Sequence, residues 1–144
     1  MRWDRALSVY LVHPAQRAMT TGRPRGLPIL MYHSIAESER GRLAYYNVNT
    51  SATVFEKQMR YLQEHGYRTI LVSEAVQLLS KHQWPEAPTV VISFDDGYRN
   101  FYTHAFAILQ EYGFTATMFL PTNYIRSVGT SFQGVESMTW NEVR

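Results

Sequence analysis

The chain has 144 residues, enough for one folded domain with a hydrophobic core and too few for two ordinary domains. Its apolar share of 45% and charged share of 18% exclude a disordered chain, and the absence of cysteine excludes disulfides and thiolate metal sites. The formal net charge of +2 is spread without a concentrated basic stripe, so no nucleic acid is expected as a partner.

Residues 1–27 are expected to form a short helix and a linker ahead of the main domain, which is assigned to 28–144. One face of this helix would carry large apolar residues: Trp3, Leu7, Tyr10 and Leu11. The helix is expected either to pack on the domain or to make a peripheral membrane contact, with its arginines near lipid headgroups. Since no signal peptide or spanning segment is recognisable, a cytoplasmic or membrane-peripheral location is expected in preference to secretion.

The main domain is predicted to alternate strands with helices. Strands are expected over 28–33, 68–72, 89–94 and 115–120. Helices are expected over 51–65, from Ser73 onward, and between Gly97 and Gly113. Because the segment 89–94 is β-branched and almost wholly apolar, it should be buried on both faces, as in a parallel sheet covered by helices. The predicted class is therefore α/β with parallel strands.

Two adjacent carboxylates, Asp95 and Asp96, follow this apolar strand, and Gly97 lets the backbone turn away from it. In parallel α/β folds, ligands bind at the carboxyl ends of the strands. Adjacent carboxylates at such a rim need a compensating cation or proton, which favours one metal ligand with a base beside it. The alternative is a pair that only caps the following helix, where the helix dipole favours negative charge.

The residues around this pair resemble a known family. Residues 93–98, SFDDGY, match the S/T-F-D-D-G pattern of the polysaccharide deacetylases (carbohydrate esterase family 4, nodulation-type deacetylase domain). Residues 28–34, PILMYHS, are similar to the opening strand of one branch of that family, and 55–71 to its next helix, turn and strand. The resemblance runs from about Leu27 to the C-terminus. It implies the front portion of a distorted (β/α) barrel, of the glycoside hydrolase/deacetylase type.

The resemblance also implies a reaction, the hydrolysis of N-acetyl or O-acetyl groups on a glycan. Asp95 would be the general base that takes a proton from a metal-bound water, and Asp96 would be a ligand of that metal, usually zinc. The backbone N–H of Tyr98 would bind the oxyanion. His33 ends the first strand on the same rim, so it is expected either to orient a carboxylate or carry a proton, or to be a hydrogen-bonded structural histidine.

The sequence departs from the family's second motif, H-S/T-x-x-H, which supplies two histidine ligands. None of its histidines has that spacing: His13, His33, His65, His82 and His104. His65 and His82 are expected near helix C-termini, where a cation complements the dipole, and His104 on a helix surface. Because a catalytic zinc needs about three protein ligands and Asp96 supplies one, weak zinc binding is expected.

The last residues predict a helix start that is not followed by a helix. Thr139 and Glu142 form the capping-box pattern, yet the sequence ends at Arg144. We therefore expect a truncated domain with an exposed sheet edge and little or no activity. The main alternative is a non-catalytic fragment or pseudoenzyme of the same fold. A phosphoacceptor signalling module is the other rival, but it needs a lysine after the acidic pair, and none follows.

Overall fold

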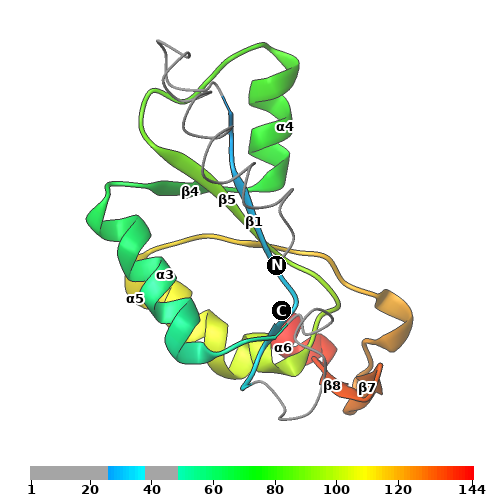
Figure 1. The fold of residues 1–144 in the computed structure, drawn as a ribbon. Helices are drawn as coiled ribbons and strands as arrows, with labels where there is room; N and C mark the ends of the chain where they lie inside the picture. The colour runs from blue at the N-terminus through cyan, green and yellow to red at the C-terminus, as the bar shows by residue number, and fades with distance from the viewer. Residues whose placement is uncertain (1–25, 38–48) are drawn as a thin grey trace, which may run out of the picture.

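The computed structural model describes residues 26–37 and 49–144 (Figure 1). The helix expected within 1–27, and His13 with it, lie outside the described residues, so the boundary between 27 and 28 stays a prediction. Within the two described ranges, no helix is long and apolar enough to cross a membrane.

The central sheet is built around β5 (Thr89–Phe94), and all of its pairings are parallel. β1 (Ile29–Tyr32) pairs with one edge of β5, so that its last residue lies opposite Phe94. The other edge of β5 pairs first with β4 (Arg68–Ile70) and then with β6 (Thr117–Met118). All six residues of β5 are buried, which confirms the strand that the sequence predicts to be covered on both faces.

Helices cover the two faces of β5 according to the alternation of its side chains. Val90, Ile92 and Phe94 pack against α3 (Ala52–Glu64) and against the helix formed by η3 (Phe101–Ala105) and α5 (Phe106–Tyr112). Val91 packs on the opposite side with Ala75 of α4 (Val72–Ser80). Figure 1 shows α3 and α5 side by side, with α4 apart from them across the sheet. The α/β class is confirmed.

An aromatic cluster supports the carboxyl ends of β1 and β5. The rings of Tyr32 and Phe94 stack with centroids 5.3 Å apart, and Phe55 of α3 meets both of them edge-on. Phe101 closes the cluster at 4.7 Å from Phe94. The Tyr32 hydroxyl donates to Gln58 Oε1 at 2.8 Å, and burial raises the pKa of Tyr32 to about 12. The carboxyl ends of β1 and β5 are therefore held in place by a tightly packed aromatic cluster.

The ends of α3 follow from its sequence. The Ser51 side chain accepts a hydrogen bond from the Val54 N–H, so Ser51 is the N-cap. Gly66 follows the helix with φ of +67°, a left-handed conformation that glycine adopts without strain. For α4 the expected start at Ser73 is wrong, because the helix begins at Val72, whose N–H donates to the Thr117 hydroxyl. A hydroxyl from a neighbouring strand satisfies the first turn in place of a local cap.

The structure adds small elements that the sequence does not predict. β2 (Ser34–Ile35) pairs in parallel with β3 (Asn49–Thr50). After the short helix η4 (Thr122–Tyr124), β7 (Thr130–Phe132) and β8 (Val135–Ser137) form an antiparallel hairpin. Its two turn residues, Gln133 and Gly134, both have positive φ, as a tight hairpin turn requires. The sequence predicts that strands alternate with helices throughout the domain. The structure departs from this prediction at the β7–β8 hairpin, where two strands follow each other directly.

Two expectations about the ends of the domain are confirmed. α6 (Trp140–Val143) begins at Thr139 with the full reciprocal capping box to Glu142. On the sheet, β1 has no second neighbour among the described strands, and its side chains Ile29 and Met31 are 60% and 63% exposed. The expected open edge with uncovered apolar surface is thus present in the part of the chain that the structure describes.

Candidate active site

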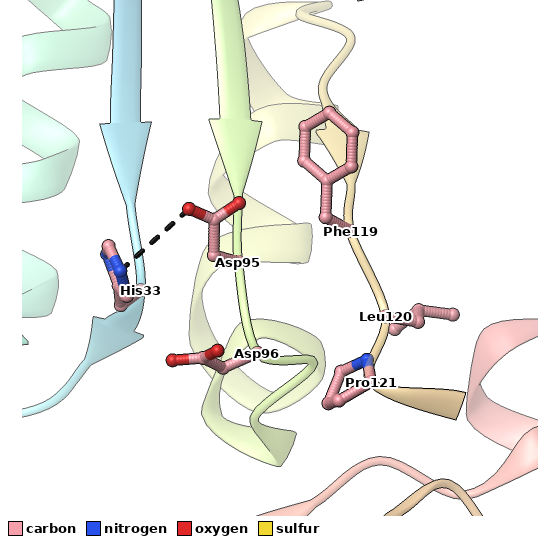
Figure 2. Close-up of a pocket in the computed structure, with 6 residues that line it drawn as sticks. All are labelled: His33, Asp95, Asp96, Phe119, Leu120 and Pro121. Carbon is pink, nitrogen blue, oxygen red and sulfur yellow. Dashed lines mark ion pairs between the residues drawn. The ribbon is translucent and has the colours of Figure 1, made fainter. Parts of the chain in front are cut away.

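An open pocket lies at the carboxyl ends of β1 and β5 (Figure 2). It has a volume of about 340 Å³. Six residues line it: His33, Asp95, Asp96, Phe119, Leu120 and Pro121. The three site side chains predicted from the sequence are thus brought together, and the segment after β6 supplies the opposite wall. That wall was missed, although the predicted strand over 115–120 ends at this same rim.

The backbone gives the two carboxylates different settings. Asp95 continues the strand, because its N–H donates to Tyr32 O at 2.9 Å. Asp96 leaves the strand with φ of +69°, and Gly97 follows with φ of +57°. Aspartate tolerates this left-handed region better than most residues, and glycine adopts it freely. Two successive left-handed residues turn the chain sharply, so both carboxylates border the pocket although they are adjacent in sequence.

Among the described residues, His33 is the basic side chain within ion-pair distance of Asp95. Its Nε2 lies 3.8 Å from Asp95 Oδ2, and the two side chains are 24% and 28% exposed (Figure 2). This distance is too long for a direct hydrogen bond, so the interaction is electrostatic and requires a protonated imidazole. A single water can bridge such a gap, which is enough for a proton to pass between the two groups.

Asp96 has a neighbour of its own in the Tyr98 side chain, which the sequence did not predict. Tyr98 is only 5% exposed, and its ring stacks on Phe132 with centroids 6.2 Å apart. Burial raises the pKa of the Tyr98 hydroxyl, and the charge of Asp96 and a hydrogen bond to it raise the pKa further. The phenol therefore stays protonated at neutral pH and presents a donor to the Asp96 carboxylate.

The backbone of Tyr98 is oriented by a neighbouring strand. The carbonyl of Gly97 accepts a hydrogen bond from the Met138 N–H at 2.9 Å, just after β8. This peptide is trans, as are all those described, so its C=O and its N–H point in opposite directions. The N–H of Tyr98, the predicted oxyanion donor, therefore points away from Met138 and is not used in that pairing.

Close packing fixes the turn at Gly97. A Cβ at this position would lie 2.7 Å from Leu120 Cδ2 and 3.2 Å from Ile125 Cδ1. The segment after β6 is therefore in direct contact with the turn that carries the carboxylates. Glycine is favoured here both by its positive φ and by this contact.

Arg99 ties the same turn to the C-terminal elements. Its Nε donates to Glu142 Oε1 at 2.8 Å, and its Nη1 to Glu136 Oε1 at 3.1 Å. Burial alone would raise the pKa of Glu142, but hydrogen bonds from the Thr139 N–H and from Arg99 outweigh it and lower the pKa. Glu142 therefore accepts hydrogen bonds both from Thr139, in the capping box, and from Arg99. Only Thr139 and Glu142 had a signal in the sequence.

The other described histidines lie away from the pocket. His65 follows α3, where its Nδ1 lies 2.8 Å from Tyr61 O, and His82 follows α4, as expected for both. His104 is exposed in η3 and contacts Thr103. No group of three or more His, Cys, Asp or Glu side chains that could hold a metal gathers in 26–37 and 49–144. The described residues therefore do not form a complete metal site by themselves.

Comparison with known proteins gives this geometry a context. A family model described as polysaccharide deacetylase matches residues 82–143. The Bacillus subtilis protein YxkH, named as a polysaccharide deacetylase, is 37% identical over 100 residues, which cover 69% of this chain. The Escherichia coli poly-β-1,6-N-acetyl-D-glucosamine N-deacetylase is 31% identical over 91 residues, which cover 63%.

The chain belongs to the polysaccharide deacetylase family. A solved structure agrees: the Streptococcus pyogenes deacetylase PplD, in complex with acetate, superposes with a TM-score of 0.67 at 27% identity over 81% of this chain. The fold is thus the front portion of the deacetylase (β/α) barrel. The chain matches only a part of each relative: 33% of the B. subtilis protein, 13% of the E. coli enzyme and 50% of the S. pyogenes structure.

Proposed function

We propose that this chain carries the carboxylate half of a deacetylase active site, which hydrolyses acetyl groups on a glycan. The observation that supports this most is the pocket at the ends of β1 and β5. It gathers Asp95 and Asp96, which lie within the matched residues 82–143, with His33, whose segment 28–34 resembles the opening strand of the family. A parallel sheet places these chemically active groups where its ligands normally bind.

Asp95 is assigned the role of general base. It takes a proton from a water molecule while the water oxygen attacks the acetyl carbonyl carbon. The carbonyl oxygen becomes an oxyanion, for which the N–H of Tyr98 is the proposed donor. When the tetrahedral centre collapses, the C–N bond breaks, the nitrogen gains a proton, and acetate and a free amine remain. His33, 3.8 Å from Asp95, is placed to relay that proton.

Asp96 is proposed as one ligand of a divalent metal, with zinc as the first candidate. The described residues supply no set of three ligands, so no step of the reaction is assigned to the metal. The same observation favours the second candidate function, a non-catalytic fragment or pseudoenzyme of the same fold. The two candidates differ in whether the pocket supports catalysis once the rest of a barrel surrounds it.

The proposed substrate is an acetylated amino-sugar polymer. The E. coli relative is named for poly-β-1,6-N-acetyl-D-glucosamine, and this supports the N-acetyl group as the first one to test. The peripheral membrane contact through the N-terminal helix expected within residues 1–27 and the location in the cell stay predictions.

A chimera tests the proposal. Residues of this chain would replace the 91 matching residues of the E. coli enzyme, and acetate release from β-1,6-linked N-acetylglucosamine oligomers would be measured. The proposal expects acetate release by the chimera and little or none by the 144-residue chain alone. A folded chimera that releases no acetate would instead support the inactive fragment.

A further inference from the structure

Asn100 makes two hydrogen bonds across the fold that the proposed chemistry does not use. Its Oδ1 accepts from the Ile35 N–H at 3.1 Å, and its Nδ2 donates to Ser34 Oγ at 2.8 Å. Because a backbone N–H is always a donor, the first bond fixes which side-chain atom is the oxygen. Ser34 and Ile35 are 3% and 0% exposed, so both bonds reach a buried strand.

These bonds hold the backbone immediately after His33. Before His33, Tyr32 is fixed by its hydroxyl bond to Gln58 and by the bond from the Asp95 N–H to its carbonyl. After His33, the strand β2 is fixed by Asn100. His33 is thus a single residue between two anchored points, and the position of its ring depends on both of them.

Asn100 also belongs to the segment that carries the carboxylates. It follows Asp95 by five positions, on the first helical turn after the left-handed pair Asp96 and Gly97. A contact from this residue to β2 therefore fixes His33 relative to Asp95, and not only relative to the sheet. Without it, the 3.8 Å approach of the two side chains would rest on the Tyr32 anchor and on the pairing of β2 with β3, which does not involve the segment that carries the carboxylates.

We propose that Asn100 is a positioning residue that holds the His33 ring against Asp95. The importance of Asn100 for the reaction rests on the proposed function. Its role in holding His33 near Asp95 does not. Aspartate can keep both contacts, because Oδ1 still accepts from the Ile35 N–H and the Ser34 hydroxyl can rotate to donate. Alanine loses both, so the two substitutions should differ in their effect on His33.

The test observes His33 in the 144-residue chain by NMR. The protein is labelled with ¹³C and ¹⁵N in histidine, and the His33 ring signals are identified by their loss in His33→Gln. The quantity measured is the change in these signals caused by Asp95→Asn at neutral pH. It is compared in the parent, in Asn100→Ala and in Asn100→Asp. Thr69→Val is the control, since the Thr69 hydroxyl accepts a comparable long-range bond from the Thr115 N–H at 2.7 Å, outside the pocket.

The expected result is that Asn100→Ala reduces the response of His33 to Asp95→Asn by about half or more, as for groups that are coupled through a shared contact. Asn100→Asp and Thr69→Val should leave the response near the parent value. An undiminished response in Asn100→Ala, or an equal loss in Thr69→Val, would overturn the proposal. If Asn100→Ala does not fold, Ser34→Ala, which removes one of the two bonds, is tested against the same outcomes.

This test is separate from that of the proposed function. If the chimera is inactive, a reduced NMR response of His33 in Asn100→Ala still supports the positioning role of Asn100. An active chimera together with an undiminished response would support the deacetylase site and reject Asn100 as its positioning residue.

Discussion

The turn at Gly97 offers a stability prediction in which two physical effects can be separated. Gly97→Ala places a side chain on a residue with φ of +57°, which costs about 1–2 kcal/mol for a residue with a Cβ. The new methyl would also meet Leu120 Cδ2 at 2.7 Å and Ile125 Cδ1 at 3.2 Å. Leu120 is half-buried and can move, but Ile125 is buried, so overpacking should add about 1 kcal/mol, the low end of its usual range.

The matched control is Gly113→Ala. Gly113 has nearly the same φ, +66°, and nothing lies within 4 Å of a Cβ built there. Both variants lose the same glycine freedom in the unfolded chain, so that contribution cancels between them. The cost of the positive φ is shared by both variants, so only overpacking separates them. The free energy of unfolding should therefore fall by about 1 kcal/mol more in the Gly97 variant than in the Gly113 variant.

Urea unfolding followed by circular dichroism measures both losses on the same scale. Equal losses in the two variants would refute the claim that the contact with the segment after β6 favours glycine at position 97. The positive φ would then be the whole reason for a glycine at this position.

Three further predictions concern the helix ends and the tyrosine beside Asp96. Ser51→Ala should destabilise the chain by about 1 kcal/mol in urea unfolding, because it removes the N-cap of α3. Since the pKa of Glu142 is lowered in the folded state, its stabilisation is present above its ordinary value of 4.5 and is lost as the pH falls through the folded value. Glu142→Gln should therefore lower stability at neutral pH and flatten its decline in acid, and parallel pH curves for the two proteins would contradict this. Tyr98→Phe, which removes the hydroxyl beside Asp96, should cost about 0.5–1.5 kcal/mol in thermal unfolding, and an unchanged midpoint would show that the contact with Asp96 contributes nothing.

The parts of the fold that could be predicted are those whose signals are local. β5 is a continuous apolar, β-branched run, and the adjacent carboxylates mark its end, so both the strand and its rim were evident. The same holds for α3, whose cap, buried face and terminal glycine all lie within the helix or next to it. Since His33 also ends a strand, the parallel class alone was enough to place it near Asp95.

The parts that could not be predicted depend on distant residues. The hairpin of β7 and β8 turns at Gln133 and Gly134, which lack the asparagine or aspartate that usually signals such a turn. α4 begins early because Thr117, far along the chain, satisfies its first N–H. Arg99 contacts Glu142 and Glu136, which lie 43 and 37 positions along the chain, so no local signal in the sequence reveals these contacts.

The most direct test of the carboxylate assignment uses the chimera with the E. coli enzyme. Asp95→Asn should lower acetate release by about 10²–10⁴-fold, as the loss of a general base does, while the chimera keeps its metal. Asp96→Asn should lower the metal content itself, and Glu111→Gln, on the exposed side of α5, should change neither. If Asp95→Asn instead lost the metal, the roles assigned to the two carboxylates would be contradicted. If acetate release survived both pocket substitutions, the assignment of this pocket as a deacetylase site would be contradicted.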